Sequence, residues 1–124
     1  MAPEDRDQIR PPIEVEIRSA DLAIVTLRGE HDASSKPELT QALALATDQL
    51  NVLVDLCECS YIDSATIGIL VAASQRLDER GGRLHVVVPQ HARVIRRVME
   101  VMGIDAILPI YDTRTAGLAS IQSA

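Results

Sequence analysis

The sequence contains no phenylalanine and no tryptophan, and two tyrosines are its only large aromatic side chains. A hydrophobic core must therefore be built from Leu, Ile, Val and Ala, which is feasible because 47% of the residues are apolar. We expect a chain of 124 residues with this composition to fold as one domain. Residues 13–124 are assigned to that domain, and residues 1–12, which are polar and rich in proline, to a flexible N-terminal tail.

Basic residues are also scarce. The chain has 12 Lys and Arg against 18 Asp and Glu, which gives a formal net charge of -6. Nucleic-acid binders need Lys and Arg to neutralise phosphates, so this balance argues against DNA or RNA as a partner. The longest apolar run, residues 67–73, is far shorter than the roughly 20 residues that cross a bilayer. Since residues 1–12 also lack the apolar segment of a secretory signal, we expect a cytoplasmic protein without a membrane span.

The two cysteines, Cys57 and Cys59, are too few and too close in sequence for a disulfide framework. Their C-x-C spacing differs from the C-x-x-C of redox and zinc sites. We therefore expect two inert thiols in a reducing compartment, with no metal site and no cofactor. His31, His85 and His91 are scattered along the chain, and no chemistry is assigned to them.

The spacing of apolar residues predicts an α/β fold. Strands over residues 13–18 and 22–28 are joined by a turn too short for a parallel crossover, so they are expected to be antiparallel. Strands and helices then alternate, which predicts a mostly parallel sheet with an antiparallel N-terminal edge strand. Further strands are predicted at 52–56, 84–88 and 107–111, helices at 37–49, 64–80, 91–102 and 113–123, and loops at 29–36 and 57–63.

One segment, Tyr61-Ile62-Asp63-Ser64-Ala65-Thr66-Ile67-Gly68, lies where the loop after a buried strand leads into a helix. Functional groups gather at the carboxyl ends of strands in open parallel sheets. One interpretation is structural: Asp63 or Ser64 caps the helix by accepting a hydrogen bond from a free backbone N–H. The other is functional, because a phosphate on a hydroxyl at a helix N-terminus would meet N–H donors and the positive end of the helix dipole. Phosphorylation there would change the surface rather than the fold.

This segment is part of a longer pattern. Leu27-Arg28-Gly29-Glu30-His31-Asp32 comes first, Val52-Leu53-Val54-Asp55-Leu56 follows, and Tyr61-Ile62-Asp63-Ser64 with Gly68 completes it. In this order the three motifs resemble the STAS domain of anti-sigma factor antagonists. The resemblance covers roughly residues 13–121 and implies a single STAS-like α/β domain packed with about four helices.

The resemblance implies a protein–protein switch and not an enzyme. In the family, the unphosphorylated antagonist binds an anti-sigma factor that is also a serine kinase, which frees the sigma factor for transcription. The kinase phosphorylates the serine after the motif aspartate, which ends binding, and a serine phosphatase resets the switch. On this sequence the acceptor is Ser64, with Thr66 as the alternative. Together with Tyr61, an aromatic residue of the kind that anchors interfaces, the predicted partner-binding residues are Asp32, Asp63, Ser64, Thr66 and Gly68.

Two positions depart from the family pattern. Thr66 stands where a glycine usually allows a kinase and its nucleotide to approach closely, and His31 replaces an apolar residue. The alternative function is therefore a STAS-domain subunit of another complex, for example in lipid transport, without a phosphorylation switch. An enzyme with Ser64 as nucleophile is a further alternative, but the chain has no G-x-S-x-G elbow and no P-loop. A response-regulator receiver is rejected because it needs a late lysine, and Lys36 is the only lysine here.

Arg93, Arg96 and Arg97 place three positive charges on the helix predicted at 91–102. Such a basic face is either an ordinary solvated surface or an electrostatic guide for an acidic partner.

Overall fold

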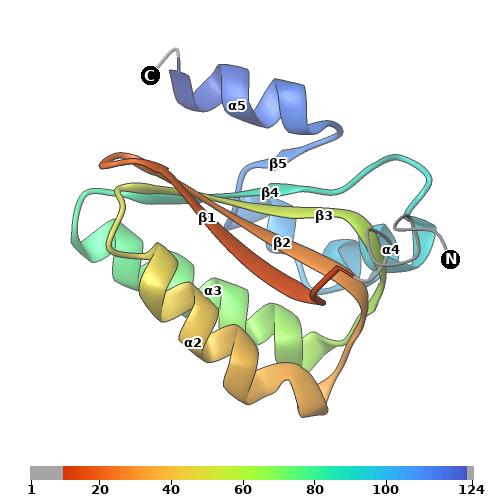
Figure 1. Cartoon of the computed structure of the whole chain (residues 1–124). Coiled ribbons are helices and arrows are strands. Elements are labelled where there is room, and N and C mark those ends of the chain that lie inside the picture. Colours follow the sequence, from red (N-terminus) through yellow and green to blue (C-terminus); the bar gives the residue numbers. More distant parts are fainter. Residues whose placement is uncertain (1–9, 123–124) are drawn as a thin grey trace, which may run out of the picture.

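A computed structural model describes residues 10–122 of the chain (Figure 1). The elements are, in chain order, β1 (Ile13–Ser19), β2 (Leu22–His31), the short 3-10 helix η1 (Ala33–Ser35), α2 (Lys36–Ala46), β3 (Asn51–Ile62), α3 (Ser64–Glu79), β4 (Arg83–Val87), α4 (Arg93–Val101), the 3-10 helix η2 (Ile104–Ala106), β5 (Ile110–Tyr111) and α5 (Arg114–Gln122). Among the described residues, no helix combines the length and the apolar character needed to cross a bilayer.

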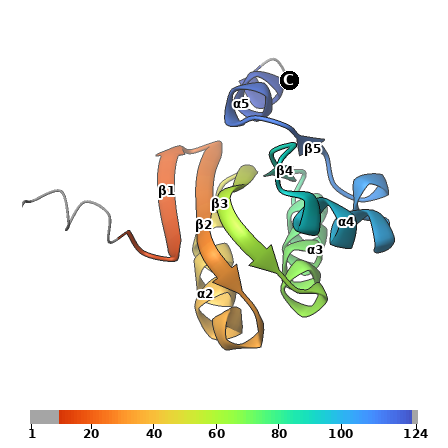
Figure 2. The same cartoon turned by 90° about the vertical axis from the view of Figure 1, so that its right-hand side faces the viewer.

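The five strands form one sheet in the order β1-β2-β3-β4-β5. β1 runs antiparallel to β2, and each of the remaining neighbours is parallel. Helices α2 and α3 cover one face of the sheet and α5 lies on the other (Figures 1 and 2). The α/β architecture, the mostly parallel sheet and its antiparallel N-terminal edge strand are thus confirmed.

The core on either side of the sheet is aliphatic, as the absence of Phe and Trp requires. The larger cluster joins the strands to α2 and α3, and α4 adds Ile95 and Met99 to it. A smaller cluster on the opposite face contains Ile24, Leu53 and Val87, against which Leu118 and Ile121 of α5 pack. Both clusters bury residues from β2, β3 and β4, as expected for strands covered on two faces.

Two segments that the sequence assigned to loops are strand instead. β2 continues through Gly29 to His31, and β3 continues through Cys59 to Ile62. The two extensions pair with each other, with Gly29 aligned with Cys59 and His31 with Ile62. Register shifts interrupt the pairing shortly before and directly after Gly29, which has a φ of 77°. Such irregularities break the alternating pattern by which strands are predicted from sequence.

Positions 1–9 of the predicted N-terminal tail lie outside the described residues. The residues that follow are held against the sheet by Arg28, whose backbone N–H donates to the carbonyl of Pro12 at 2.8 Å and whose Nη1 donates to that of Pro11 at 3.1 Å. The Arg28 guanidinium also pairs with Glu14 at 2.8 Å and with Glu58 at 3.2 Å. Arg28 thus connects the chain before β1 to the middle of the sheet.

Candidate functional site

The N-terminus of α3 is capped by Asp63. Its carboxylate Oδ1 accepts a hydrogen bond from the backbone N–H of Thr66 at 2.8 Å. Of the two capping residues that the sequence allowed, Asp63 therefore makes the cap. Ser64 is the first residue of the helix and is exposed to solvent. No group among residues 10–122 forms a hydrogen bond with its hydroxyl.

Thr66 lies inside the protein, with none of its surface exposed. Its hydroxyl is 2.6 Å from Oδ1 of Asp63 and 3.4 Å from the carbonyl oxygen of His31. The same carbonyl accepts a hydrogen bond from the Asp63 N–H at 3.2 Å. Thr66 and Asp63 together tie the end of β2 to the start of α3. Thr66, predicted from the sequence as a partner-binding residue, is thus part of the interior.

The spacing of α3 contains the signal for this position. Thr66 shares one helical face with Leu70, Ala73 and Leu77, all of which are buried. Residues that recur at intervals of three and four lie on the same side of a helix. An apolar pattern that includes a threonine therefore marks that threonine as a core residue.

His31 is also buried, at 1% exposure, and both of its ring nitrogens have partners. Nε2 is 2.9 Å from the carbonyl oxygen of Arg28, and Nδ1 is 3.1 Å from the hydroxyl of Ser35. A carbonyl can only accept, so in the neutral ring Nε2 donates and Nδ1 accepts from Ser35. A polar ring is tolerated where the family pattern has an apolar residue because both nitrogens are satisfied within the turn.

Asp32 follows His31 and is exposed at the beginning of η1. Its carboxylate accepts hydrogen bonds from the hydroxyl of Ser34 at 2.6 Å and from the Ser34 N–H at 2.9 Å. These bonds lower the pKa of Asp32, so it stays ionised well below neutral pH. Because the His31 carbonyl binds the Asp63 N–H, the Asp32 carboxylate belongs to the same end of the sheet as Asp63.

The exposed face of α3 behind Ser64 carries no charge. Residues 64–75 contain no Asp, Glu, Lys or Arg, and Ala65 and Gly68 are exposed there. We call Asp32, Asp63, Ser64, Ala65 and Gly68 the Ser64 surface. It combines two carboxylates with small uncharged residues, over which another protein can lie closely. Tyr61, at the end of β3, is 41% exposed.

The two cysteines are not part of this chemistry. Cys57 packs with the cluster under α5, whereas Cys59 belongs to the larger cluster on the other face of the sheet. Burial raises the pKa of Cys57 to about 12, with a contribution from its hydrogen bond to Asp55, and burial also raises the pKa of Cys59. Both are free thiols, and their raised pKa values favour the protonated form over the thiolate. Within residues 10–122, no three His, Cys, Asp or Glu side chains are grouped closely enough to hold a metal ion.

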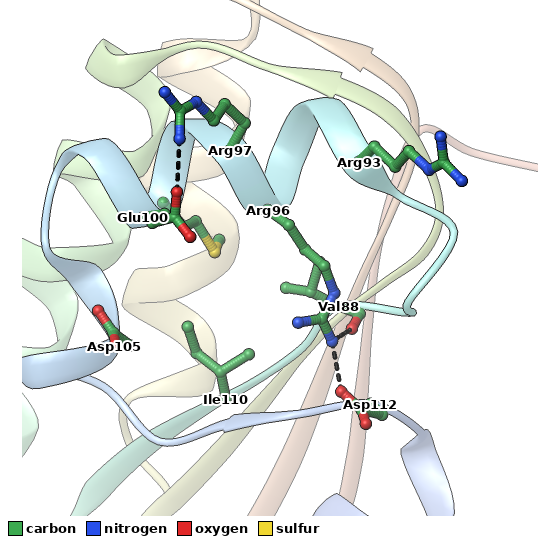
Figure 3. Close-up of a pocket in the computed structure, with 9 residues that line it drawn as sticks. Val88, Arg93, Arg96, Arg97, Glu100, Asp105, Ile110 and Asp112 are labelled. Atoms are coloured by element: carbon green, nitrogen blue, oxygen red, sulfur yellow. Dashed lines mark hydrogen bonds and ion pairs between the residues drawn. The ribbon is translucent and has the colours of Figure 1, made fainter.

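The predicted basic face of α4 is largely neutralised (Figure 3). Arg96 pairs with Asp112, and Arg97 pairs with Glu100 at 2.6 Å. Arg93, the third arginine, forms no ion pair with any of the described residues. The cavity of about 510 Å³ beside the helix is lined by these three arginines and by three carboxylates. The face therefore has little net positive charge with which to guide an acidic partner.

Comparison with known proteins connects this geometry to a family. A family model described as "Mlab, STAS domain" matches residues 15–109. The anti-sigma-B factor antagonist of Listeria monocytogenes is 31% identical over 100 residues, which are 79% of this chain and 86% of that protein. The crystal structure of an anti-sigma factor antagonist from Mycobacterium paratuberculosis is 27% identical, with a TM-score of 0.78 over 89% of this chain and 92% of that one. The unphosphorylated form of the antagonist SpoIIAA shares the fold, with 16% identity and a TM-score of 0.72 over 90% and 97% of the two chains.

Proposed function

This chain belongs to the STAS domain family, and from that premise we propose that it is an anti-sigma factor antagonist. Its unphosphorylated form binds an anti-sigma factor that is also a serine kinase. Phosphorylation of Ser64 by that kinase ends the complex, and a serine phosphatase restores binding. The role is the one named for relatives that are 31% and 27% identical and that align over most of their length.

The observation that carries the proposal is the division of roles between Ser64 and its neighbours. Asp63 and Thr66 complete the cap of α3, and the exposed Ser64 hydroxyl is not needed for it. Phosphorylation of Ser64 therefore breaks no hydrogen bond within the described residues. The phosphate would lie at the positive end of a helix of 16 residues, so the fold tolerates it.

The effect on a partner would be large, because the Ser64 surface already has two carboxylates. A phosphate adds about two further negative charges. A partner that packs closely against Ala65 and Gly68 would then have to bury or neutralise this charge, which costs much more than covering a hydroxyl. Phosphorylation thus changes recognition while the helix and the sheet stay as they are.

The inward position of Thr66 also accounts for its departure from the family pattern. With none of its surface exposed, its side chain places no obstacle outside the helix where the family has glycine. It is equally out of reach of a kinase, which favours Ser64 as the acceptor. An enzyme that uses Ser64 as a nucleophile is disfavoured because no base among the described residues contacts its hydroxyl.

The experiment that tests this proposal is phosphosite mapping by mass spectrometry on the protein isolated from its own cells, during growth and under stress. Cleavage after glutamate is preferable to trypsin, because it releases residues 59–79 as one fragment. The hydroxyl acceptors in this fragment are Ser60, Tyr61, Ser64, Thr66 and Ser74.

Phosphate on Ser64 is the expected result. Phosphate on Thr66 would mean that the start of α3 opens before the kinase acts, and the acceptor would have to be reassigned. If no fragment carries phosphate under any condition, the proposed phosphorylation switch is contradicted. A STAS-domain subunit of another complex, such as a lipid-transport assembly, then becomes the better interpretation.

A further inference from the structure

The outer edge of β1 presents backbone groups that no other strand of residues 10–122 pairs with. Hydrogen bonds to β2 alternate along an antiparallel strand. The Arg28 N–H bonds the Pro12 carbonyl, and the register continues from Ile13 opposite Leu27. The residues whose backbone faces β2 are Glu14 and Glu16, and those whose backbone faces the free edge are Ile13, Val15 and Ile17.

The charged side chains of β1 lie in one row on the face away from α2. Glu14 pairs with Arg28 of β2 on that face, and Arg18 pairs with Glu16. All three β1 side chains remain between two-fifths and one-half exposed. On the opposite face Ile13 and Val15 pack against the core, while Ile17 is 53% exposed. The edge thus combines backbone groups that no strand of residues 10–122 pairs with, a row of charged side chains and an apolar side chain that is about half exposed.

We propose that β1 pairs antiparallel with β1 of a second copy of this chain, about a two-fold axis at Glu16. In that register Glu14 lies opposite Arg18 of the second copy, and the same pair is formed again by symmetry. Val15 meets Ile17 of the second copy on the other face, and both present their backbone groups to each other. The overlap follows the part of β1 from Glu14 to Arg18, and Ser19 is left outside it because the register of β1 against β2 shifts between Ile17 and Ser19.

The order of charges distinguishes this register from the neighbouring ones that the backbone allows. An axis at Val15 keeps the hydrogen bonds but places Glu14 opposite Glu16 twice, which is repulsive. The proposed register has a single Glu16–Glu16 contact on its axis, and Arg18 already pairs with Glu16 within each chain. An axis at Ile17 places Glu16 opposite Arg18 but leaves the first residues of β1 outside the overlap, so fewer hydrogen bonds form.

Charged residues usually protect an edge strand against pairing. On this edge the sequence Glu-x-Glu-x-Arg complements itself under a two-fold rotation. This charge pattern therefore disfavours pairing with strands of other sequence but allows pairing with β1 of a second copy.

The pairing adds to the proposed function without depending on it. β2 separates β1 from β3, and Ser64 follows β3. Both Ser64 surfaces therefore stay accessible in the dimer, which would present two of them on one continuous sheet.

The test is sedimentation equilibrium of the full chain at concentrations up to millimolar, with two charge reversals. E14R places an arginine opposite Arg18 of the second copy, and R18E places a glutamate opposite Glu14, each of them twice by symmetry. Each variant alone is expected to associate about tenfold more weakly than the parent. An equimolar mixture should recover association, because the mixed dimer pairs opposite charges at both places. The matched control is a mixture of E38R and R76E, which makes the same changes of net charge on exposed helix positions.

A parent chain that remains monomeric at every concentration overturns the proposal. So does equal association of both β1 variants and the parent, or recovery by the control mixture as well as by the β1 mixture. A folded E14R that associates as strongly as the parent overturns the register, because Glu14 would then lie outside the overlap. Glu14 also pairs with Arg28, so circular dichroism must confirm that E14R is folded. R18E leaves that pair intact, and its association still decides whether the β1 edge is used if E14R does not fold.

Discussion

Asp63 and Thr66 share one carboxylate oxygen. Oδ1 of Asp63 accepts from the Thr66 backbone N–H at 2.8 Å and from the Thr66 hydroxyl at 2.6 Å. The first bond caps α3, and the second fixes the carboxylate from inside the protein. The serine between them in sequence is left exposed. This arrangement separates the residue that we propose is modified from the residues that hold the helix.

Asp63→Ala should destabilise the protein. Loss of a helix cap costs about 1 kcal/mol, and the buried Thr66 hydroxyl would also lose its nearer acceptor. Urea unfolding at neutral pH measures the change. Ser64→Ala is the matched control, because it alters the adjacent exposed residue and should stay within about 0.5 kcal/mol of the parent. Equal losses in the two variants would contradict the assignment of the cap to Asp63.

Thr66→Val should cost about 1 kcal/mol of unfolding free energy. The substitution keeps the shape of the side chain and removes only the hydroxyl, so its effect isolates the bonds to Asp63 and His31. Thr66→Gly should cost more, because it also removes buried atoms and places a flexible residue in the first turns of α3. A glycine variant as stable as the parent would show that the threonine is not held inside as the structure has it.

Ser64→Asp should weaken binding of the anti-sigma factor partner while leaving the fold unchanged. A carboxylate at the first residue of a helix stabilises it by about 0.3–1 kcal/mol, so any loss of binding does not come from unfolding. Co-purification of the tagged chain from its own cells, with quantitative mass spectrometry, compares the partner retained by the parent, Ser64→Asp and Ser64→Ala. Ser64→Ala should retain it. If Ser64→Asp retains the partner as well as the parent does, negative charge at this position is not what ends the complex.

The sequence predicts the parts of this site that depend on local patterns. The predicted start of α3 at Ser64 is the observed one. Gly81 and Gly103, which have φ values of 81° and 69°, follow the ends of α3 and α4 as predicted. The strand extensions to His31 and Ile62 depend on pairing between segments thirty residues apart, which a single sequence does not reveal. The interior position of His31 likewise depends on two partners, Arg28 and Ser35, that only the folded turn provides. Local periodicity sets the elements, and tertiary contacts decide which polar residues are enclosed.

His85, which lies on the face of the sheet covered by α5, should make the stability of the protein depend on pH. It is 5% exposed, with Nδ1 3.1 Å from the Tyr111 hydroxyl and Nε2 3.2 Å from Oδ1 of Asn51. Burial lowers the pKa of His85 to about 4, with a smaller contribution from Arg83. In the unfolded chain the imidazole takes up a proton near its ordinary pKa of 6.5, whereas the folded protein keeps it neutral. Protonation therefore favours the unfolded state as the pH falls from 6.5 towards 4.

The contribution of His85 is complete above pH 6.5 and is lost below it, by about 2 kcal/mol between pH 7.5 and pH 5. Urea unfolding at a series of pH values measures this slope. His85→Phe keeps a ring in the same place and should flatten the slope, even though it lowers stability at every pH by removing the bond to Asn51 and leaving the Tyr111 hydroxyl with Ser120 alone. His91→Gln, a change at an exposed histidine, is the control and should keep the slope. In His85→Phe the unfolded chain has no imidazole at position 85 to protonate. A slope that persists in this variant would therefore assign the pH dependence to another group.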